Sequence, residues 1–164
     1  MLVMARLKAI FAAFAVSIVA STALADDMDD EIVLTVLGLD ETIELSINDL
    51  REIGEATFET TTIWTEGVQV FTGVPLNMFV QSFGVEDGEM VATAVNDYAI
   101  GIPVVEALEE GPMIAYRRNG ENMPVRDKGP LWIVYPYDSS PEFETEVTHS
   151  RSIWQLNRIS FQAE

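Results

Sequence analysis

Gly73-Val74-Pro75-Leu76 is the point at which one local sequence pattern gives way to another, and the prediction of the fold starts from it. Glycine and proline break the chain here, and the apolar side chains of Leu76–Phe83 then recur at helical spacing until Gly84. This pattern predicts a short helix that ends at the glycine. Upstream, Phe58–Trp64 alternates and is rich in threonine, which favours a β-strand. The stretch therefore predicts a strand, a break and a short helix in succession.

Short apolar runs separated by turn residues continue this interleaving in both directions. The expected strands are Ile32–Gly38, Thr42–Leu45, Met90–Val95, Met113–Arg117, Leu131–Tyr135 and Trp154–Phe161. The other expected helices are Ile47–Ile53, with Ser46 as its N-cap, and Val104–Glu109, while Glu142–His149 is ambiguous. There is no regular strand–helix–strand period, so we expect a single α+β domain, rich in β-structure, around one core.

Residues 1–25 have the three parts of a secretory signal peptide. The basic Arg6 and Lys8 precede the apolar stretch Ala9–Ala20, and Ala23-Leu24-Ala25 supplies the small residues of a cleavage site. An uncleaved membrane anchor is the alternative, because the uncharged stretch reaches the short limit of what spans a bilayer. There is no twin-arginine pair, which indicates the general export route for an unfolded chain. We therefore expect a periplasmic or secreted protein with no membrane span after cleavage.

The composition narrows the chemistry open to the chain. Its 164 residues include 27 acids, nine bases, one histidine and no cysteine. The lack of cysteine excludes disulfides, thiolate metal ligands and cysteine nucleophiles. The formal charge of −18 argues against nucleic-acid binding, which needs clustered Lys and Arg. Residues 26–31 form an acidic leader, which we interpret as a solvated charge run because it lacks the glycine and distal glutamate of a calcium loop.

Five of the seven bases that follow residue 25 are candidates for binding an anion. They are Arg117, Arg118, Arg126, Lys128 and Arg151. The first four fall within twelve residues, and guanidinium groups suit a carboxylate, phosphate or sulfate. The alternative is that these bases pair with acids of the same chain, which are in large surplus.

The aromatic residues and the lone histidine allow a second kind of site. Trp64, in a threonine-rich strand before Gly67, is the candidate wall of a ligand pocket. Trp132 and Trp154 lie in apolar strands and are interpreted as core residues. His149 is interpreted as a surface residue, because neighbours in sequence such as Ser150 rarely converge into a hydrolytic triad.

The breaks and turns of the chain also fall in the order typical of a known family. In sequence order they are Gly73-Val74-Pro75-Leu76, Asn96-Asp97-Tyr98, Ile102-Pro103, Ile114-Ala115-Tyr116, Asn119-Gly120, Gly129-Pro130-Leu131, Tyr135-Pro136 and Ser150-Arg151-Ser152-Ile153-Trp154 before Ile159. From about Glu55 to Phe161 the chain resembles the oxidoreductase molybdopterin-binding domain of the sulfite-oxidase-like family. The resemblance implies a single domain of that fold over residues 32–164.

The resemblance implies that active members hold molybdenum on a pterin dithiolene, ligated by a cysteine upstream of the Gly-Val-Pro-Leu segment. The matching stretch here is Thr60–Trp64, and hydroxyl groups are poor substitutes for a soft thiolate. Trp132 and Ile153 stand where active members carry an arginine and a lysine near the anionic cofactor. Export of an unfolded chain would also leave behind a cofactor loaded in the cytoplasm. We therefore expect no cofactor, with molybdopterin as the alternative.

These observations favour an exported ligand- or partner-binding module over an enzyme. The expected partners are a small anion, a membrane sensor that the module would serve, or another exported protein. The alternative function is that of a molybdopterin-dependent oxidoreductase of the sulfite-oxidase type with a non-cysteine metal site.

Overall fold

The computed structural model describes residues 29–38 and 40–162, so the predicted signal peptide lies outside the described residues. The strands are β1 (Ile32–Leu37), β2 (Ile43–Ser46), β3 (Ala56–Thr60), β4 (Gln69–Pro75), β5 (Glu89–Ala94), β6 (Ala99–Pro103), β7 (Met113–Arg118), β8 (Glu121–Asn122), β9 (Leu131–Val134) and β10 (Trp154–Gln162). The helices are α2 (Ile47–Ile53), α3 (Leu76–Ser82), α4 (Val104–Ala107) and α5 (Glu146–Arg151), with 3-10 turns η1 (Val125–Asp127), η2 (Tyr137–Ser139) and η3 (Pro141–Phe143). The predicted α+β, β-rich class is confirmed.

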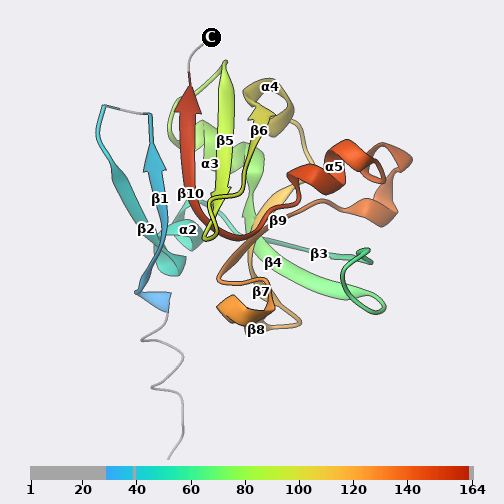
Figure 1. Ribbon diagram of the computed structural model, residues 1–164. Coiled ribbons are helices and arrows are strands. Elements are labelled where there is room, and N and C mark those ends of the chain that lie inside the picture. Colours follow the sequence, from blue (N-terminus) through green and yellow to red (C-terminus); the bar gives the residue numbers. More distant parts are fainter. Residues whose placement is uncertain (1–28, 39, 163–164) are drawn as a thin grey trace, which may run out of the picture.

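The strands form one sheet whose main path runs β2-β1-β10-β9-β7-β4-β3. β5 pairs with β10 and carries β6, and β8 pairs with the end of β7. Within this sheet β1 and β10 are parallel and the other pairs are antiparallel. Figure 1 shows β3 and β4 projecting on the side of the molecule opposite β1 and β2.

β10 joins the two halves of the sheet. Its first residues pair with β9, where Trp154 lies opposite Trp132, and its later residues pair with β5 and β1. The register shifts between Trp154 and Leu156, and Gln155 there has a positive φ of 53°. This bulge separates the two pairings and places Trp154 at the edge of the candidate site described below.

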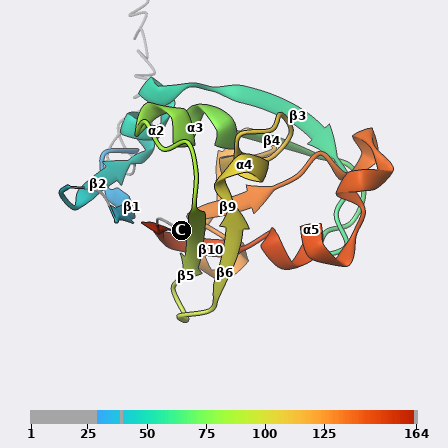
Figure 2. The same cartoon turned by 90° about the horizontal axis from the view of Figure 1, so that it is seen from above.

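The helix predicted over Ile47–Ile53 is confirmed, and a capping box begins it. The Ser46 hydroxyl accepts from the Asp49 amide at 3.1 Å, and the Asp49 carboxylate accepts from the Ser46 amide at 2.7 Å. These reciprocal bonds satisfy amides that a helix start leaves open. Seen from above, α2 and α3 lie side by side and α5 lies apart from them (Figure 2).

Two local predictions around Gly73 need correction. The segment Gly73–Pro75 is not a break but the end of β4, in which Gly73 lies opposite Ala115 of β7. A β-carbon on this glycine would lie 2.2 Å from the Ile114 carbonyl oxygen, so the glycine permits close approach of the two strands. The preceding strand ends at Thr60, and residues 61–68 form a loop that carries Trp64.

The core lies between the sheet and α2, α3 and α4. Trp132, Tyr116, Phe71 and Phe79 are its largest fully buried side chains. Phe71 and Trp132 meet edge to face, with ring centroids 5.4 Å apart. In the described part of the chain, no helix is long and apolar enough to cross a membrane.

Candidate functional site

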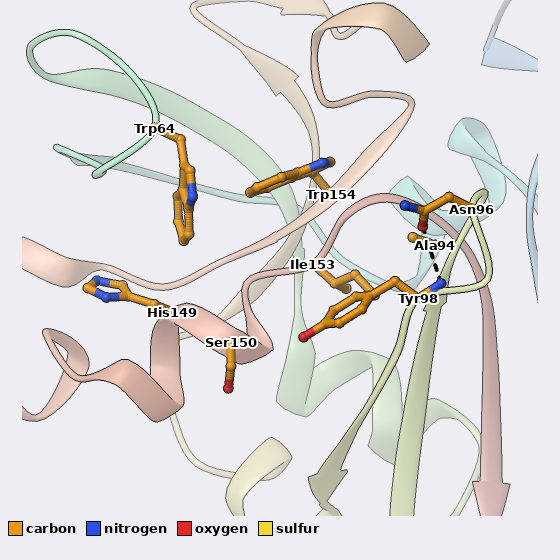
Figure 3. A pocket seen from close by; sticks show the side chains of 8 residues that line it. All are labelled: Trp64, Ala94, Asn96, Tyr98, His149, Ser150, Ile153 and Trp154. Carbon is orange, nitrogen blue, oxygen red and sulfur yellow. Dashed lines mark hydrogen bonds between the residues drawn. The ribbon is translucent and has the colours of Figure 1, made fainter.

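An aromatic pocket opens where the β3–β4 loop, the β5–β6 turn and the junction of α5 with β10 meet. Its volume is about 250 Å³. The side chains that line it are Trp64, Ala94, Asn96, Tyr98, His149, Ser150, Ile153 and Trp154. Figure 3 shows the two tryptophans and the histidine on one side of this pocket and Tyr98 with Asn96 on the other. We call this set the aromatic pocket.

Trp64 is fixed in place by the hydrogen bonds of its loop. The Asp138 carboxylate accepts from the amide and the hydroxyl of Thr61, at 2.5 and 2.6 Å. These bonds hold the pKa of Asp138 below its usual value, so the carboxylate stays charged and keeps accepting them. Thr62 accepts from the Trp64 amide at 3.1 Å and shares a hydrogen bond with Thr65. The loop therefore presents the indole from an anchored backbone.

The Trp64 ring is the centre of an aromatic cluster. It meets Trp132, Tyr137, His149 and Trp154 edge to face, with centroids 5.4–6.3 Å apart. His149 also lies 5.6 Å from the Tyr137 ring. His149 is thus half-buried between two rings, which differs from the surface position expected for it. Trp154 also differs from the expected core position, because it remains 37 % exposed on the wall of the pocket.

Polar groups with free hydrogen-bonding capacity face the pocket from the β5–β6 turn. The Asn96 side-chain oxygen accepts from the Tyr98 amide at 3.2 Å, which orients the amide group (Figure 3). Among the described residues neither the Asn96 side-chain nitrogen nor the Tyr98 hydroxyl has a hydrogen-bond partner. Apolar walls with a few available polar groups are typical of a small-molecule site.

The pocket carries no Lys, Arg, Asp or Glu in its lining. One cation close to its wall is Lys128, whose ammonium lies 5.9 Å from the Trp154 ring and 5.7 Å from the Trp132 ring. Such cation–π contacts contribute about 0.5–1 kcal/mol at exposed sites.

The hydroxyl groups expected at the metal-ligand position are all engaged. Thr60 is fully buried, donates to the Thr61 carbonyl oxygen and accepts from the Asp138 amide, both at 3.2 Å. Thr61 bonds to Asp138, and Thr62 bonds to Thr65 at 2.8 Å. Their hydrogen bonds stabilise the loop, and none of these three hydroxyls points free into the pocket.

The five candidate bases do not meet in one place. Arg117, at the end of β7, pairs with Asp29, whereas its neighbour Arg118 pairs with Asp127. Arg151, on α5, pairs with Glu106 of α4.

The remaining two of the five bases follow the Asn119-Gly120 turn. Lys128 lies 3.8 Å from Asp127, which it shares with Arg118. Arg126 is exposed and makes no ion pair with any residue in the described ranges. Four of the five bases thus neutralise acids of this chain, the arrangement that we weighed as the alternative to an anion site.

Two groups of site residues were missing from the sequence-based prediction. Asn96, Tyr98 and Ile153 lie in segments that carry the family resemblance, but they were not predicted to line a pocket, which they reach because β5, β6 and β10 pair. The sequence pattern does not single out Arg51, which shares Asp29 with Arg117 across the fold. Both groups depend on contacts between segments that are distant in sequence.

Comparison with known families decides the relationship of this chain to other proteins. The family model described as oxidoreductase molybdopterin binding domain matches residues 21–139, most of the chain. The chain belongs to this family. The resemblance inferred from the order of its turns is therefore confirmed. No curated protein matches the chain.

A solved structure shows the same fold for the molybdopterin-binding domain. The crystal structure of the sulfane dehydrogenase SoxCD from Paracoccus pantotrophus superposes with a TM-score of 0.59 at 16 % sequence identity. The match covers 80 % of this chain and 38 % of the SoxCD chain, so this chain spans well under half the length of that protein. At this identity the likeness establishes the sulfite-oxidase-type fold.

The expectation that the domain has no cofactor is corrected by the family match. The family is one of molybdopterin-binding domains, and membership points to binding of a molybdopterin. The expectation was based on the missing cysteine, on the loss of two cations near the anionic cofactor and on export of an unfolded chain. The first of these concerns the metal alone, because a thiolate ligand holds the metal and not the pterin ring. Loss of the metal ligand is therefore no argument against binding of the pterin.

The residues of the aromatic pocket fit one part of a molybdopterin better than another. Aromatic walls with uncharged hydrogen-bonding groups suit the flat pterin ring. A volume of about 250 Å³ is small for a whole cofactor, so the phosphate would lie outside the pocket. For molybdenum itself the chain offers no thiolate ligand, because it contains no cysteine. The pocket fits the pterin and not a thiolate-ligated metal.

Proposed function

We propose that this molybdopterin-binding domain holds the pterin ring of its ligand in the aromatic pocket and acts as a binding module. The observation that supports the proposal is the pocket itself, in which an exposed tryptophan face lies opposite unpaired polar groups on Asn96 and Tyr98. A bound molybdopterin would bring redox chemistry at its metal, to which this chain adds no thiolate. Service to a membrane sensor remains a prediction from the sequence.

Each side chain of the pocket has a definable part in this proposal. Trp154 offers its 37 % exposed ring for stacking, and Trp64 supports that ring edge-on from 5.4 Å. The free Asn96 side-chain nitrogen donates to ring acceptors, and the Tyr98 hydroxyl either donates or accepts. Stacking of a heteroaromatic ring on an aromatic side chain contributes about 1–3 kcal/mol, so Trp154 is expected to carry most of the affinity.

Titration calorimetry with pterin tests this assignment. We expect Trp154→Ala to weaken pterin binding by about tenfold or more, the loss that corresponds to one stacked ring. Val105→Ala is the control, because Val105 is 63 % exposed on α4 and does not line the pocket. Equal pterin affinity for Trp154→Ala and the unaltered protein would rule out the aromatic pocket as the pterin site.

The content of the purified protein tests the ligand class separately. From a host that makes the cofactor, we expect pterin to copurify, as measured by its fluorescence after release. Stoichiometric molybdenum by mass spectrometry would instead favour the oxidoreductase alternative and a metal sphere completed without protein sulfur. The proposal would be contradicted if the purified protein contained no pterin and also failed to bind pterin in the calorimeter.

A further inference from the structure

Within the acidic leader, Asp29 does not lie in solvent as expected for a charge run, whereas Asp30 and Glu31 are exposed. Asp29 is only 5 % exposed and is buried against α2, β7 and β8. Its neighbour Asp30 accepts from the Asn48 side-chain amide at 2.7 Å. The part of the leader that the structure describes is therefore attached to the domain.

Three donors from three elements converge on the Asp29 carboxylate. One carboxylate oxygen accepts from the terminal nitrogens of Arg51 and Arg117, at 3.0 and 2.9 Å. The other oxygen accepts from the Asn122 side-chain amide at 2.8 Å. Hydrogen bonds between guanidinium and carboxylate are roughly twice as strong as neutral ones. We call Asp29, Arg51, Arg117 and Asn122 the Asp29 site.

The positions of the donors are set by groups other than Asp29. Arg117 donates its Nε to the Asn122 side-chain oxygen at 3.0 Å, which locks these two side chains together. Both guanidiniums lie over the Tyr116 ring, 5.8 and 6.0 Å from its centroid.

Tyr116 is itself held beneath the two guanidiniums. Its hydroxyl donates to Glu55 at 2.5 Å, and burial, together with this bond, raises the pKa of Tyr116 to about 12. The ring therefore stays neutral at pH 7 and remains a hydrogen-bond donor. Because groups other than Asp29 hold the donors in place, the site is arranged to bind a carboxylate before the carboxylate of Asp29 enters it.

Without the Asp29 carboxylate, the positive charges at the site would lack one acidic partner. Glu55 lies 3.5 Å from the Nε of Arg51 and is already bonded to Tyr116. Arg117 has no acidic partner other than Asp29 among residues 29–38 and 40–162. Removal of the Asp29 side chain would thus expose one unpaired guanidinium and one freed amide donor facing the same point. Groups of this kind bind planar anions in a bidentate manner.

From this geometry we infer that Arg51, Arg117 and Asn122 form a carboxylate-binding site, which the chain fills with its own Asp29 and which accepts another carboxylate when Asp29 is absent. The site shares no residue with the aromatic pocket. Asp29 is part of the chain, so its effective concentration is high and a free carboxylate competes poorly with it. Asp29 consequently ties the start of the described chain to the domain, and the site is an internal receptor for its carboxylate.

Thermal unfolding in acetate tests this inference, with chloride at equal ionic strength as the reference. We expect Asp29→Ala to unfold at a lower temperature than the unaltered protein in chloride. Acetate should then raise its midpoint by several degrees, with a shift that grows with the logarithm of the acetate concentration, because a ligand of the native state stabilises it. Neither the unaltered protein nor Asp87→Ala, which removes an exposed acid elsewhere, should respond to acetate more than to chloride.

The double variant Asp29→Ala/Arg117→Ala separates site binding from a general salt effect. It should lose the acetate response, because one of the two guanidiniums is gone. The inference is wrong if Asp29→Ala responds equally to acetate and chloride, or if the double variant keeps the full acetate response. If Asp29→Ala does not fold in chloride, folding in acetate supports the inference. Failure of both Asp29→Ala and the milder Asp29→Ser to fold in acetate overturns it.

Discussion

The aromatic pocket and the Asp29 site differ in whether their polar groups have hydrogen-bond partners within the chain. In the pocket, the Asn96 amide nitrogen and the Tyr98 hydroxyl have no partner among the described residues. In the Asp29 site, both carboxylate oxygens and all three donors are paired within 3.0 Å. The two exposed groups of the pocket can exchange water for a ligand, whereas the donors of the Asp29 site are already occupied by the chain's own carboxylate.

The two regions also differ in what holds them together. The pocket depends on aromatic packing around Trp64, which is non-directional in its main contribution and tolerates an exposed wall. The Asp29 site depends on charge-assisted hydrogen bonds, which are lost as soon as one partner is removed. A substitution in the pocket should therefore be able to weaken ligand binding with little loss of protein stability. A substitution in the Asp29 site should weaken carboxylate binding and protein stability together.

The largest effect is expected for Trp132→Ala. Trp132 is fully buried beneath the aromatic pocket, and truncation of a buried Phe or Trp to Ala costs about 3–5 kcal/mol of unfolding free energy. Trp154→Ala should cost clearly less, because that ring is 37 % exposed, although it should lose more pterin affinity than stability. Urea unfolding monitored by circular dichroism measures the loss of stability in both variants, and titration calorimetry measures the loss of pterin affinity. Equal destabilisation by the two variants would contradict the division into a core ring and a binding wall.

A smaller effect is expected for Asp29→Asn, and it should depend on pH. Burial raises the pKa of Asp29, but hydrogen bonds from Asn122 and Arg51 and the charges of Arg117 and Arg51 outweigh it, so the pKa lies below 3.8. The variant should lose about 1–3 kcal/mol at pH 7, the usual cost of disrupting a buried charge-assisted bond.

The sign of the pH dependence follows from that lowered pKa. The Asp29 contribution is complete above the unfolded-state value of 3.8 and is lost as the pH falls through the lower folded-state value. The difference in unfolding free energy between the unaltered protein and Asp29→Asn should therefore be constant from pH 7 to about pH 5 and shrink below about pH 4. A difference that persists unchanged at pH 2 would show that the Asp29 charge is not what stabilises the site.

The fold was predictable where local sequence sets local structure. Ser46 and Asp49 encode a capping box, and the α2 helix follows from it. The prediction of a chain break at Gly73 was wrong, because glycine and proline are typical of turns, whereas Gly73 lies in β4 and allows its close contact with β7. A glycine required by a neighbouring strand has the same sequence signal as a glycine in a turn.

The sites were less predictable because they are built from distant segments. The clustering of bases near Asn119-Gly120 drew attention to Arg117, but its partners Asp29 and Arg51 lie 88 and 66 positions away in the sequence. A surplus of acids made internal pairing expected without showing which acid pairs with which base. The missing cysteine concerns only the metal ligand and was a poor guide to the pterin, since different atoms bind the two.

The smallest effect is expected for Arg118→Ala, the residue next to Arg117. Its partner Asp127 is 45 % exposed, whereas the Asp29 side chain is 8 % exposed. Exposed ion pairs contribute about 0.2–1 kcal/mol and weaken with salt, so Arg118→Ala should cost that little at low salt and less at high salt. Arg126→Ala, which removes an exposed base with no ion pair in the described ranges, is the control. If Arg118→Ala lost as much unfolding free energy as Asp29→Asn, burial of the carboxylate would not be what distinguishes the two arginines. The Asp29 site would then be no stronger than an ordinary surface ion pair.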